Sequence, residues 1–200
     1  MKRLKLIFCL LCLCCSLTEA KEVQVDAQKE VDEMTGRLVA SYLEAKVDED
    51  VIAGYATALR SDGSFPDLDY ITVYEGSFYP AGSHLKRLKS MAIAYRKPGN
   101  KYYNSGKLLK QIVAGIDYWY KVRPKSGNWW FGDIGAPQDY MVPLILLKGK
   151  ISEKKLLHYS SYLRDLTGNK GHKGKNRTWV SAVTIHKGCI EDNIELIRTG

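Results

Sequence analysis

The sequence predicts an all-α protein built from helical hairpins, and three observations lead to this prediction. Apolar residues recur at three- and four-residue spacing along most of the chain, which is the period of a helix with one buried face. The segments between these runs are rich in glycine, proline and asparagine, as expected of loops that join neighbouring helices. Strand patterns are rare, and YITVYEGSFY, residues 70–79, is the only plausible strand.

Apolar spacing indicates the first four helices in chain order. The first contains Val31, Met34, Leu38 and Tyr42. A shorter helix follows over residues 51–59 and ends at the turn sequence RSDGS. The third contains Leu85, Leu88, Met91, Ala92 and Tyr95. The fourth contains Leu108, Leu109, Ile112, Val113, Ile116, Trp119 and Tyr120.

Three further helices are predicted in the second half of the chain. The segment after Pro137 has a helical pattern, although Pro143 should kink the helix or delay its start. The next helix should run from Ser152, a good N-cap residue, to about Leu166. One last helix is indicated by Val183, Ile190, Ile194 and Ile197.

The N-terminus has the pattern of a secretory signal peptide over residues 1–20. A basic start precedes an apolar run over residues 6–17, and Thr18-Glu19-Ala20 ends the segment with a small-x-small pattern. The run is too short to span a bilayer, so we expect cleavage near Ala20 and no stable membrane insertion. A membrane anchor is the alternative, and polar residues directly after the run argue against it. The prediction is a secreted or periplasmic protein.

The remaining residues, 21–200, are expected to form one domain. Four of the five cysteines lie in the signal segment, which leaves Cys189 and therefore no internal disulfide. Removal of the signal lowers the net charge from +8 to +6. A basic exported protein suggests an anionic partner, and outside the cytoplasm an anionic polysaccharide is more available than nucleic acid. The alternative is that the lysines only keep the protein soluble.

The stretch SGNWWFGDIGAP, residues 126–137, places two tryptophans side by side. Adjacent side chains point in different directions on a helix or a strand, so one buried face cannot easily hold both Trp129 and Trp130. An exposed indole can stack on the apolar face of a sugar ring, and Asn128 and Asp133 beside the pair can bond sugar hydroxyls. The alternative is that both rings fill the gap where two hairpins meet. Spacing alone leaves both interpretations open.

The second candidate segment is NKGHKGKNRTW, residues 169–179. Its glycine-rich loop carries a set of cationic side chains: Lys170, His172, Lys173, Lys175 and Arg177. Backbone N–H groups, cations and the start of a helix together can bind an anion. Asn176 occupies the expected N-cap position. The alternative is that the asparagine only caps the helix and the loop is solvated.

No cofactor or metal site is expected. Phosphate-binding glycine loops and paired metal-ligand spacings are absent from the sequence. Asp62, Asp67 and Asp69 fit no calcium loop, and turn formation explains them more simply. The four histidines are scattered and are expected to be surface or packing residues: His84, His158, His172 and His186.

Four segments in order resemble the N-terminal part of the family 8 polysaccharide lyases, which include chondroitin AC, hyaluronan and xanthan lyases. They are DGSFPDLDY (62–70), HLKRLKSMAIAYRKPGNKYY (84–103), NWWFGDIGAP (128–137) and GKNRTWVSAVTIHKGCIEDN (174–193). The resemblance covers nearly the whole of residues 21–200. Gly132 and Lys175 depart from the residues that the family more often has at these positions.

The resemblance implies a fold and a reaction. The family fold begins with an incomplete (α/α) toroid of helical hairpins, followed by β-sandwich domains. Its members cleave uronate-containing anionic polysaccharides, such as glycosaminoglycans, by β-elimination. The resemblance implies that Trp129 and Trp130 line the substrate cleft and that Asn176 neutralises the uronate carboxylate. Asn128 and Arg177 are further candidates for binding the sugar chain.

The resemblance also implies that the family's proton-transferring tyrosine and histidine lie further along the toroid than Asn193. The 200-residue chain is therefore expected to be part of a lyase and inactive alone. The alternative is a non-catalytic helical glycan-binding protein. A nucleic-acid binder is disfavoured because of the signal segment.

Overall fold

The computed structural model describes residues 26–164 and 171–200, and every regular element in these two ranges is helical. The predicted signal segment, residues 1–20, lies outside the described residues. The bounds in chain order are residues 26–43, α2 (Glu49–Ala58), α3 (Gly82–Arg96), α4 (Gly106–Val122), the π-helix η1 (Phe131–Gly135), α5 (Ala136–Leu147), α6 (Glu153–Ser160), α7 (Gly174–Ile190) and α8 (Ile194–Thr199). The prediction of an all-α fold is confirmed. In the described part, no helix has the length and apolar character needed to cross a membrane.

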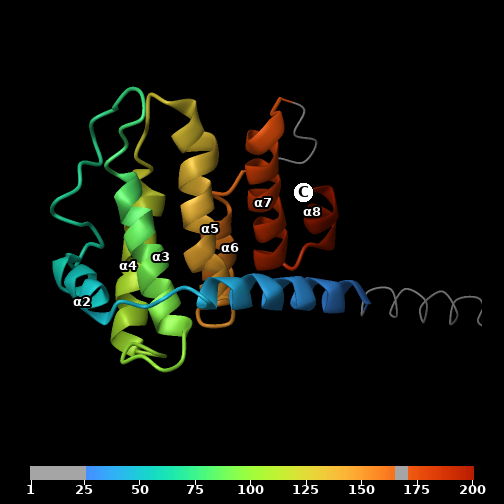
Figure 1. Cartoon of the computed structure of the whole chain (residues 1–200), viewed down its shortest axis with the longest axis horizontal. Coiled ribbons are helices and arrows are strands. Elements are labelled where there is room, and N and C mark those ends of the chain that lie inside the picture. Colours follow the sequence, from blue (N-terminus) through green and yellow to red (C-terminus); the bar gives the residue numbers. More distant parts are fainter. Residues whose placement is uncertain (1–25, 165–170) are drawn as a thin grey trace, which may run out of the picture.

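Three helical hairpins stand side by side: α3–α4, α5–α6 and α7–α8. The first helices of the hairpins form one layer, in which α5 packs between α3 and α7 (Figure 1). These three helices are parallel, and all begin at the top of Figure 1. We call this end the loop end; it carries residues 70–79, 123–128 and 171–173. The helix over residues 26–43 crosses the opposite end.

The core lies between the two layers of this arrangement. It is formed mainly by α3 and α5, whose side chains are buried along most of their length. Trp119 of α4 and Tyr159 of α6 complete it from the second layer, and both are fully buried. The hairpin prediction therefore holds: α3, α5 and α7 each pack against a neighbour in their own layer and against a helix of the second layer, and the outer faces of α4, α6 and α8 can be polar.

The predicted strand over residues 70–79 is wrong. Asp69 instead fixes the backbone in turns: its Oδ1 accepts hydrogen bonds from the backbone N–H of Ile71 (2.8 Å) and of Thr72 (3.0 Å). Its Oδ2 accepts a third bond from the Tyr74 hydroxyl at 2.9 Å. These local bonds take up backbone donors that a strand would pair with a neighbour. The Thr72 side chain, together with these bonds, holds the pKa of the Asp69 carboxyl well below its usual range.

The single last helix that spacing predicts is in fact two helices. Helix α7 ends at Ile190, and Asp192 adopts a left-handed backbone conformation with φ of 52°. Asn193 then caps α8, since its side-chain oxygen accepts from the Leu196 N–H at 3.1 Å. The helical spacing continues across the break because α8 folds back on α7 and buries the same apolar set.

Two helix boundaries also differ from the prediction. Helix α5 begins at Ala136 with Pro137 in its first turn, so Pro143 does not delay the start. The helix after Ser152 ends at Ser160 rather than near Leu166. Residues 165–170, which include Leu166 and Lys170, lie outside the described residues.

His84 is a packing residue in the core, which is one of the two roles expected of the histidines. It is 0% exposed, and its Nε2 bonds the Gly115 carbonyl at 2.9 Å. A carbonyl can only accept, so Nε2 carries the proton and Nδ1 accepts from the Tyr70 hydroxyl at 3.0 Å. Burial is the main reason that the pKa of His84 falls to about 4.

This histidine should make stability depend on pH. Its folded pKa lies below the unfolded value of about 6.5, so the unfolded chain binds the proton first as the pH falls. We expect its contribution to be complete above about pH 6.5 and to decrease by about 3 kcal/mol by pH 4. Urea unfolding of wild type and of His84→Gln across this range measures the effect. An equal pH dependence in the two proteins would contradict it.

Candidate functional site

The two tryptophans begin a helix that starts at residue 129 and continues through η1 and α5. Asn128 caps this helix, because its Oδ1 accepts from the Trp130 backbone N–H at 3.0 Å. Its Nδ2 donates to the Gly76 carbonyl at 2.8 Å and so ties loop 70–79 to the helix start. The amide retains one further lone pair and one further N–H for a ligand.

Asn128→Ala should therefore remove a cap and a loop tether together. We expect the free energy of unfolding to fall by about 1–2 kcal/mol, the usual effect of losing an N-cap side chain. Thermal unfolding measures this loss. Asn128→Asp keeps the capping oxygen but cannot donate to the Gly76 carbonyl, so it should recover only part of the stability; an Asp variant as unstable as the Ala variant would contradict the capping role.

Trp129 and Trp130 have different environments. Trp129 is 52% exposed, and its ring stacks on His172 with centroids 5.6 Å apart and an interplanar angle of 26°. Trp130 is half-buried and meets the ring of Trp179 edge to face at 5.6 Å. The two rings therefore have different roles: Trp129 is available as a stacking surface, and Trp130 packs this helix against α7.

The π-helical turn helps to place Trp130. A π-turn contains one more residue than an α-turn and often occurs at functional sites. Gly135 ends this turn, and a Cβ atom added to it would lie 2.6 Å from Cζ3 of Trp130. The absence of a side chain at Gly135 therefore lets the indole lie against the helix backbone.

The first turn of α7 contributes the second half of the site. Lys173 is the N-cap residue and Asn176 lies inside the helix, so the expectation that Asn176 is the N-cap is wrong. The helix begins at Gly174, so the cap lies three residues earlier than expected. Asn176 is half-buried and Arg177 is exposed. Trp179, one turn after Asn176, holds this end of α7 against Trp130.

The loop end is electrostatically positive for two reasons. Helices α3, η1–α5 and α7 all begin there, and each helix N-terminus carries a partial positive charge (Figure 1). Exposed cations also gather in the same segments: Lys125, Lys173, Lys175 and Arg177. Asp133, one of the acidic groups nearby, forms an ion pair with Arg164 at 2.6 Å. An anionic chain would be attracted to this end.

His186 and Asp67, which were also considered as candidate ligands in the sequence, stabilise the fold. His186 is buried and bonds the Tyr42 hydroxyl and the Ala182 carbonyl, and burial lowers its pKa. Asp67 forms a two-bond ion pair with Arg87 at the edge of the core. In residues 26–164 and 171–200, no three potential ligands come together as a metal site would require.

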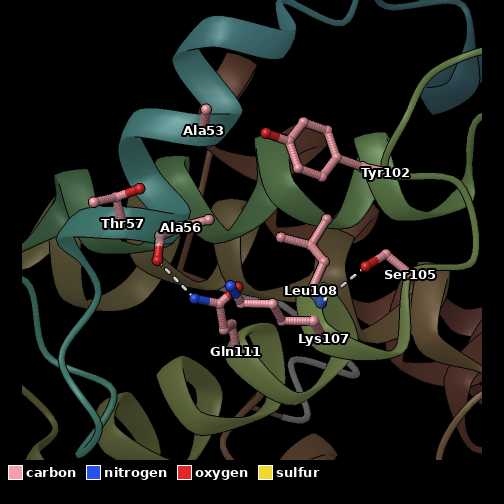
Figure 2. A pocket seen from close by; sticks show the side chains of 8 residues that line it. All are labelled: Ala53, Ala56, Thr57, Tyr102, Ser105, Lys107, Leu108 and Gln111. Atoms are coloured by element: carbon pink, nitrogen blue, oxygen red, sulfur yellow. Dashed lines mark hydrogen bonds between the residues drawn. The ribbon is translucent and has the colours of Figure 1, made fainter.

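A pocket of about 410 Å³ lies between α2 and the start of α4, away from the loop end (Figure 2). Gln111 donates to the Ala56 carbonyl at 2.6 Å, and Ser105 accepts from the Leu108 N–H at 3.3 Å. Its polar side chains thus hold α4 and α2 in place. None of the site residues that the sequence predicts lines this pocket, so the candidate site is the loop end.

Known proteins with similar sequences support the all-α fold described above. Residues 42–200 match the family model described as "Polysaccharide lyase family 8, N terminal alpha-helical domain". Chondroitinase-AC of Pedobacter heparinus is 36% identical over 141 residues, which cover 70% of this chain and 20% of that protein. Xanthan lyase of a Bacillus species is 27% identical over 146 residues, covering 70% and 14%. The chain therefore spans about a fifth, or less, of the length of these relatives.

Solved structures give the same result for the fold. A chondroitinase AC lyase solved in oligosaccharide complexes matches with a TM-score of 0.75 and 25% identity, over 84% of this chain and 25% of that one. A Streptomyces coelicolor chondroitin AC lyase, solved with chondroitin sulphate, matches with a TM-score of 0.70 and 16% identity, over 84% and 26%. Both are α-toroid lyases, and the hairpins described above form part of such a toroid.

Proposed function

Because this chain belongs to polysaccharide lyase family 8, we propose that it forms the substrate-binding N-terminal part of a lyase that cleaves uronate-containing glycosaminoglycans by β-elimination. The observation that carries the proposal is the exposed ring of Trp129 beside the first turn of α7, at the positive end of three parallel helices. The substrate would be a chondroitin- or hyaluronan-like chain. Export through the signal segment, residues 1–20, is part of the same proposal.

The proposed binding mode follows from the chemistry of the side chains. The apolar face of a pyranose ring stacks on Trp129, whose other face is supported by His172. The uronate carboxylate turns toward the first turn of α7, where backbone N–H groups without helical partners and the Asn176 amide can donate. Arg177 and Asn128 bind neighbouring groups of the chain. The cationic side chains of the loop end attract the anionic sugar chain over a long range, and added salt should weaken this attraction.

In the elimination, a base takes the proton from C5 of the uronate, the bond from C4 to the glycosidic oxygen breaks, and an acid protonates that oxygen. The C5 proton is poorly acidic while the carboxylate keeps its full charge. A hydrogen bond from Asn176 that strengthens as charge moves onto the carboxylate would lower this barrier. We propose that residues outside this 200-residue chain supply the acid and the base. His84 and His186 are engaged in the core, His158 packs on Tyr120, and His172 stacks on Trp129 as its support.

A glycan-binding protein without catalytic activity is the second candidate. The observation that favours it is that the loop end offers stacking, amide and cationic groups, all of which serve binding.

Mixing the purified chain with chondroitin tests the binding that both candidates require. Retention of the chain on immobilised chondroitin supports binding, and the ultraviolet absorbance of an unsaturated uronate would reveal cleavage. We expect the purified chain to be retained and the absorbance of an unsaturated uronate to be absent. If the chain is not retained, both candidate functions are wrong. The same absorbance assay on a chimera, in which residues 42–200 replace the matching segment of the Pedobacter heparinus chondroitinase-AC, separates the two candidates, because only a lyase part should support cleavage there.

A further inference from the structure

A small pocket of about 130 Å³ lies next to Trp130, between the start of α3 and the junction of η1 and α5. Tyr79, Trp130 and Phe131 form its aromatic walls, and Lys86, Gln138 and Asp139 form its polar side. The pocket shares Trp130 with the proposed sugar site but does not include Trp129, Asn176 or Arg177.

The aromatic walls are held in place by packing. The Phe131 ring lies 5.1 Å from Tyr79 and 5.3 Å from Trp130, between centroids. The Tyr79 hydroxyl donates to the Pro124 carbonyl at 2.9 Å, which fixes that ring. Added Cβ atoms at Gly135 and Gly82 would lie 2.6 Å from Trp130 and 3.0 Å from Tyr79, respectively. Two glycines therefore let the rings approach the helix backbones, and the pocket is formed before any ligand binds.

The polar side offers both donors and acceptors. Lys86 is exposed and can donate, and the half-buried Gln138 amide can donate and accept. Asp139 is an acceptor, and Lys89 partly balances its charge at 3.6 Å. A ligand group that fits must therefore combine an apolar part for the rings with one hydrogen-bond donor and one acceptor.

The volume of the pocket further restricts which ligand group can occupy it. A volume of about 130 Å³ is well below the ~300–1,000 Å³ of pockets that enclose whole ligands, so the pocket suits one substituent of a sugar ring. We propose that it holds the acetamido group of an N-acetylhexosamine. The methyl group would lie against the aromatic walls, the amide N–H would face Asp139, and the carbonyl would accept from Gln138 or Lys86. A sulfate or carboxylate fits less well, because it would meet the Asp139 carboxylate and three apolar rings.

This inference rests on the proposed function and adds a specificity to it. In chondroitin and hyaluronan a uronate alternates with an N-acetylhexosamine. A uronate stacked on Trp129 therefore has an acetamido-bearing sugar as its immediate neighbour. Trp129 and Trp130 begin the same helix, and Trp130 lines the pocket, so the proposal places consecutive sugars of one chain in the two subsites.

The test compares two chondroitin tetrasaccharides by calorimetric titration of the chain. One is natural; the other is N-deacetylated and then N-formylated, so that it keeps a neutral amide and loses only the methyl group. We expect the natural compound to bind about tenfold more tightly, the usual effect of losing one methyl contact in a fitted pocket. Gln138→Leu removes a donor to the carbonyl that both compounds keep, so it should weaken both by a similar factor and leave the preference for the methyl group unchanged. Gln28→Leu, on the helix at the opposite end, is the matched control and should change neither affinity.

Saturation-transfer NMR on wild type gives an independent measurement that needs no variant. The acetyl methyl protons should receive the strongest saturation. Equal affinity for the two tetrasaccharides, or weak saturation of the methyl protons, would overturn the acetamido subsite while the proposed function stands. A preference for sulfated over unsulfated tetrasaccharide that disappears in Gln138→Leu would place an anion in the pocket instead. Binding of neither tetrasaccharide would overturn the proposed function, and this inference with it.

Discussion

Trp129→Ala is expected to weaken binding of a chondroitin tetrasaccharide by about thirtyfold and to leave the melting temperature nearly unchanged. The indole is 52% exposed, so its removal costs little packing, but it takes away the flat ring face on which a sugar is proposed to stack. A tryptophan at the centre of a binding surface is typically worth ~2 kcal/mol, which corresponds to this factor. Calorimetric titration and thermal unfolding of the variant give the two values.

Trp130→Ala provides the contrast. This ring is half-buried between Trp179 and Phe131, so its loss should lower the free energy of unfolding by about 2–3 kcal/mol, somewhat less than for a fully buried tryptophan. Trp130→Phe keeps an aromatic ring and should recover part of that stability. If Trp129→Ala destabilises the fold as much as Trp130→Ala does, then Trp129 is a packing residue and its stacking role is wrong.

Asn176→Ala is expected to lower the turnover of a catalytically complete protein by about 10²–10³-fold, with a much smaller change in KM. The reason is that its amide would bond the carboxylate more strongly as negative charge develops there, and removal of one such donor has this effect. A suitable protein is a chimera in which residues 42–200 replace the matching segment of the Pedobacter heparinus chondroitinase-AC. Initial rates over a range of chondroitin concentrations give both constants.

Lys175→Ala is the matched control, because Lys175 is exposed on the same helical turn. It should raise KM modestly at low salt, by weakening the attraction of an anionic chain, and leave turnover unchanged. The carboxylate role of Asn176 would be contradicted by a variant that raises KM while turnover stays at the wild-type value, since that result describes ordinary binding.

The positions of the helices could be predicted from the sequence because the apolar residues on the buried face of a helix recur at three- and four-residue spacing. Helices α3 and α4 lie within one to three residues of the apolar runs that indicated them. Boundaries were less predictable where a single polar side chain decides them. Asn193 and the left-handed Asp192 divide α7 from α8, although the apolar period continues through both. Asp69 similarly converts an alternating segment into turns through three hydrogen bonds.

The site was only partly predictable. The adjacent tryptophans left two interpretations open, a surface for sugar stacking or a filled gap between hairpins, and spacing could not decide between them for either ring. The choice depends on two contacts between segments more than 40 residues apart, with His172 supporting Trp129 and Trp179 packing on Trp130. Neither partner could have been chosen from the sequence pattern. The π-turn and the role of Gly135 also have no sequence signal beyond a glycine near the tryptophans.

The claim that the loop end binds an anionic polysaccharide is tested most directly by calorimetric titration of the purified chain with a chondroitin tetrasaccharide at two salt concentrations. The account predicts measurable binding that Trp129→Ala weakens by about thirtyfold. The binding should also weaken as salt rises, because exposed cations and three helix N-termini contribute to it. Undetectable binding at low salt, or binding that Trp129→Ala leaves unchanged, would contradict it.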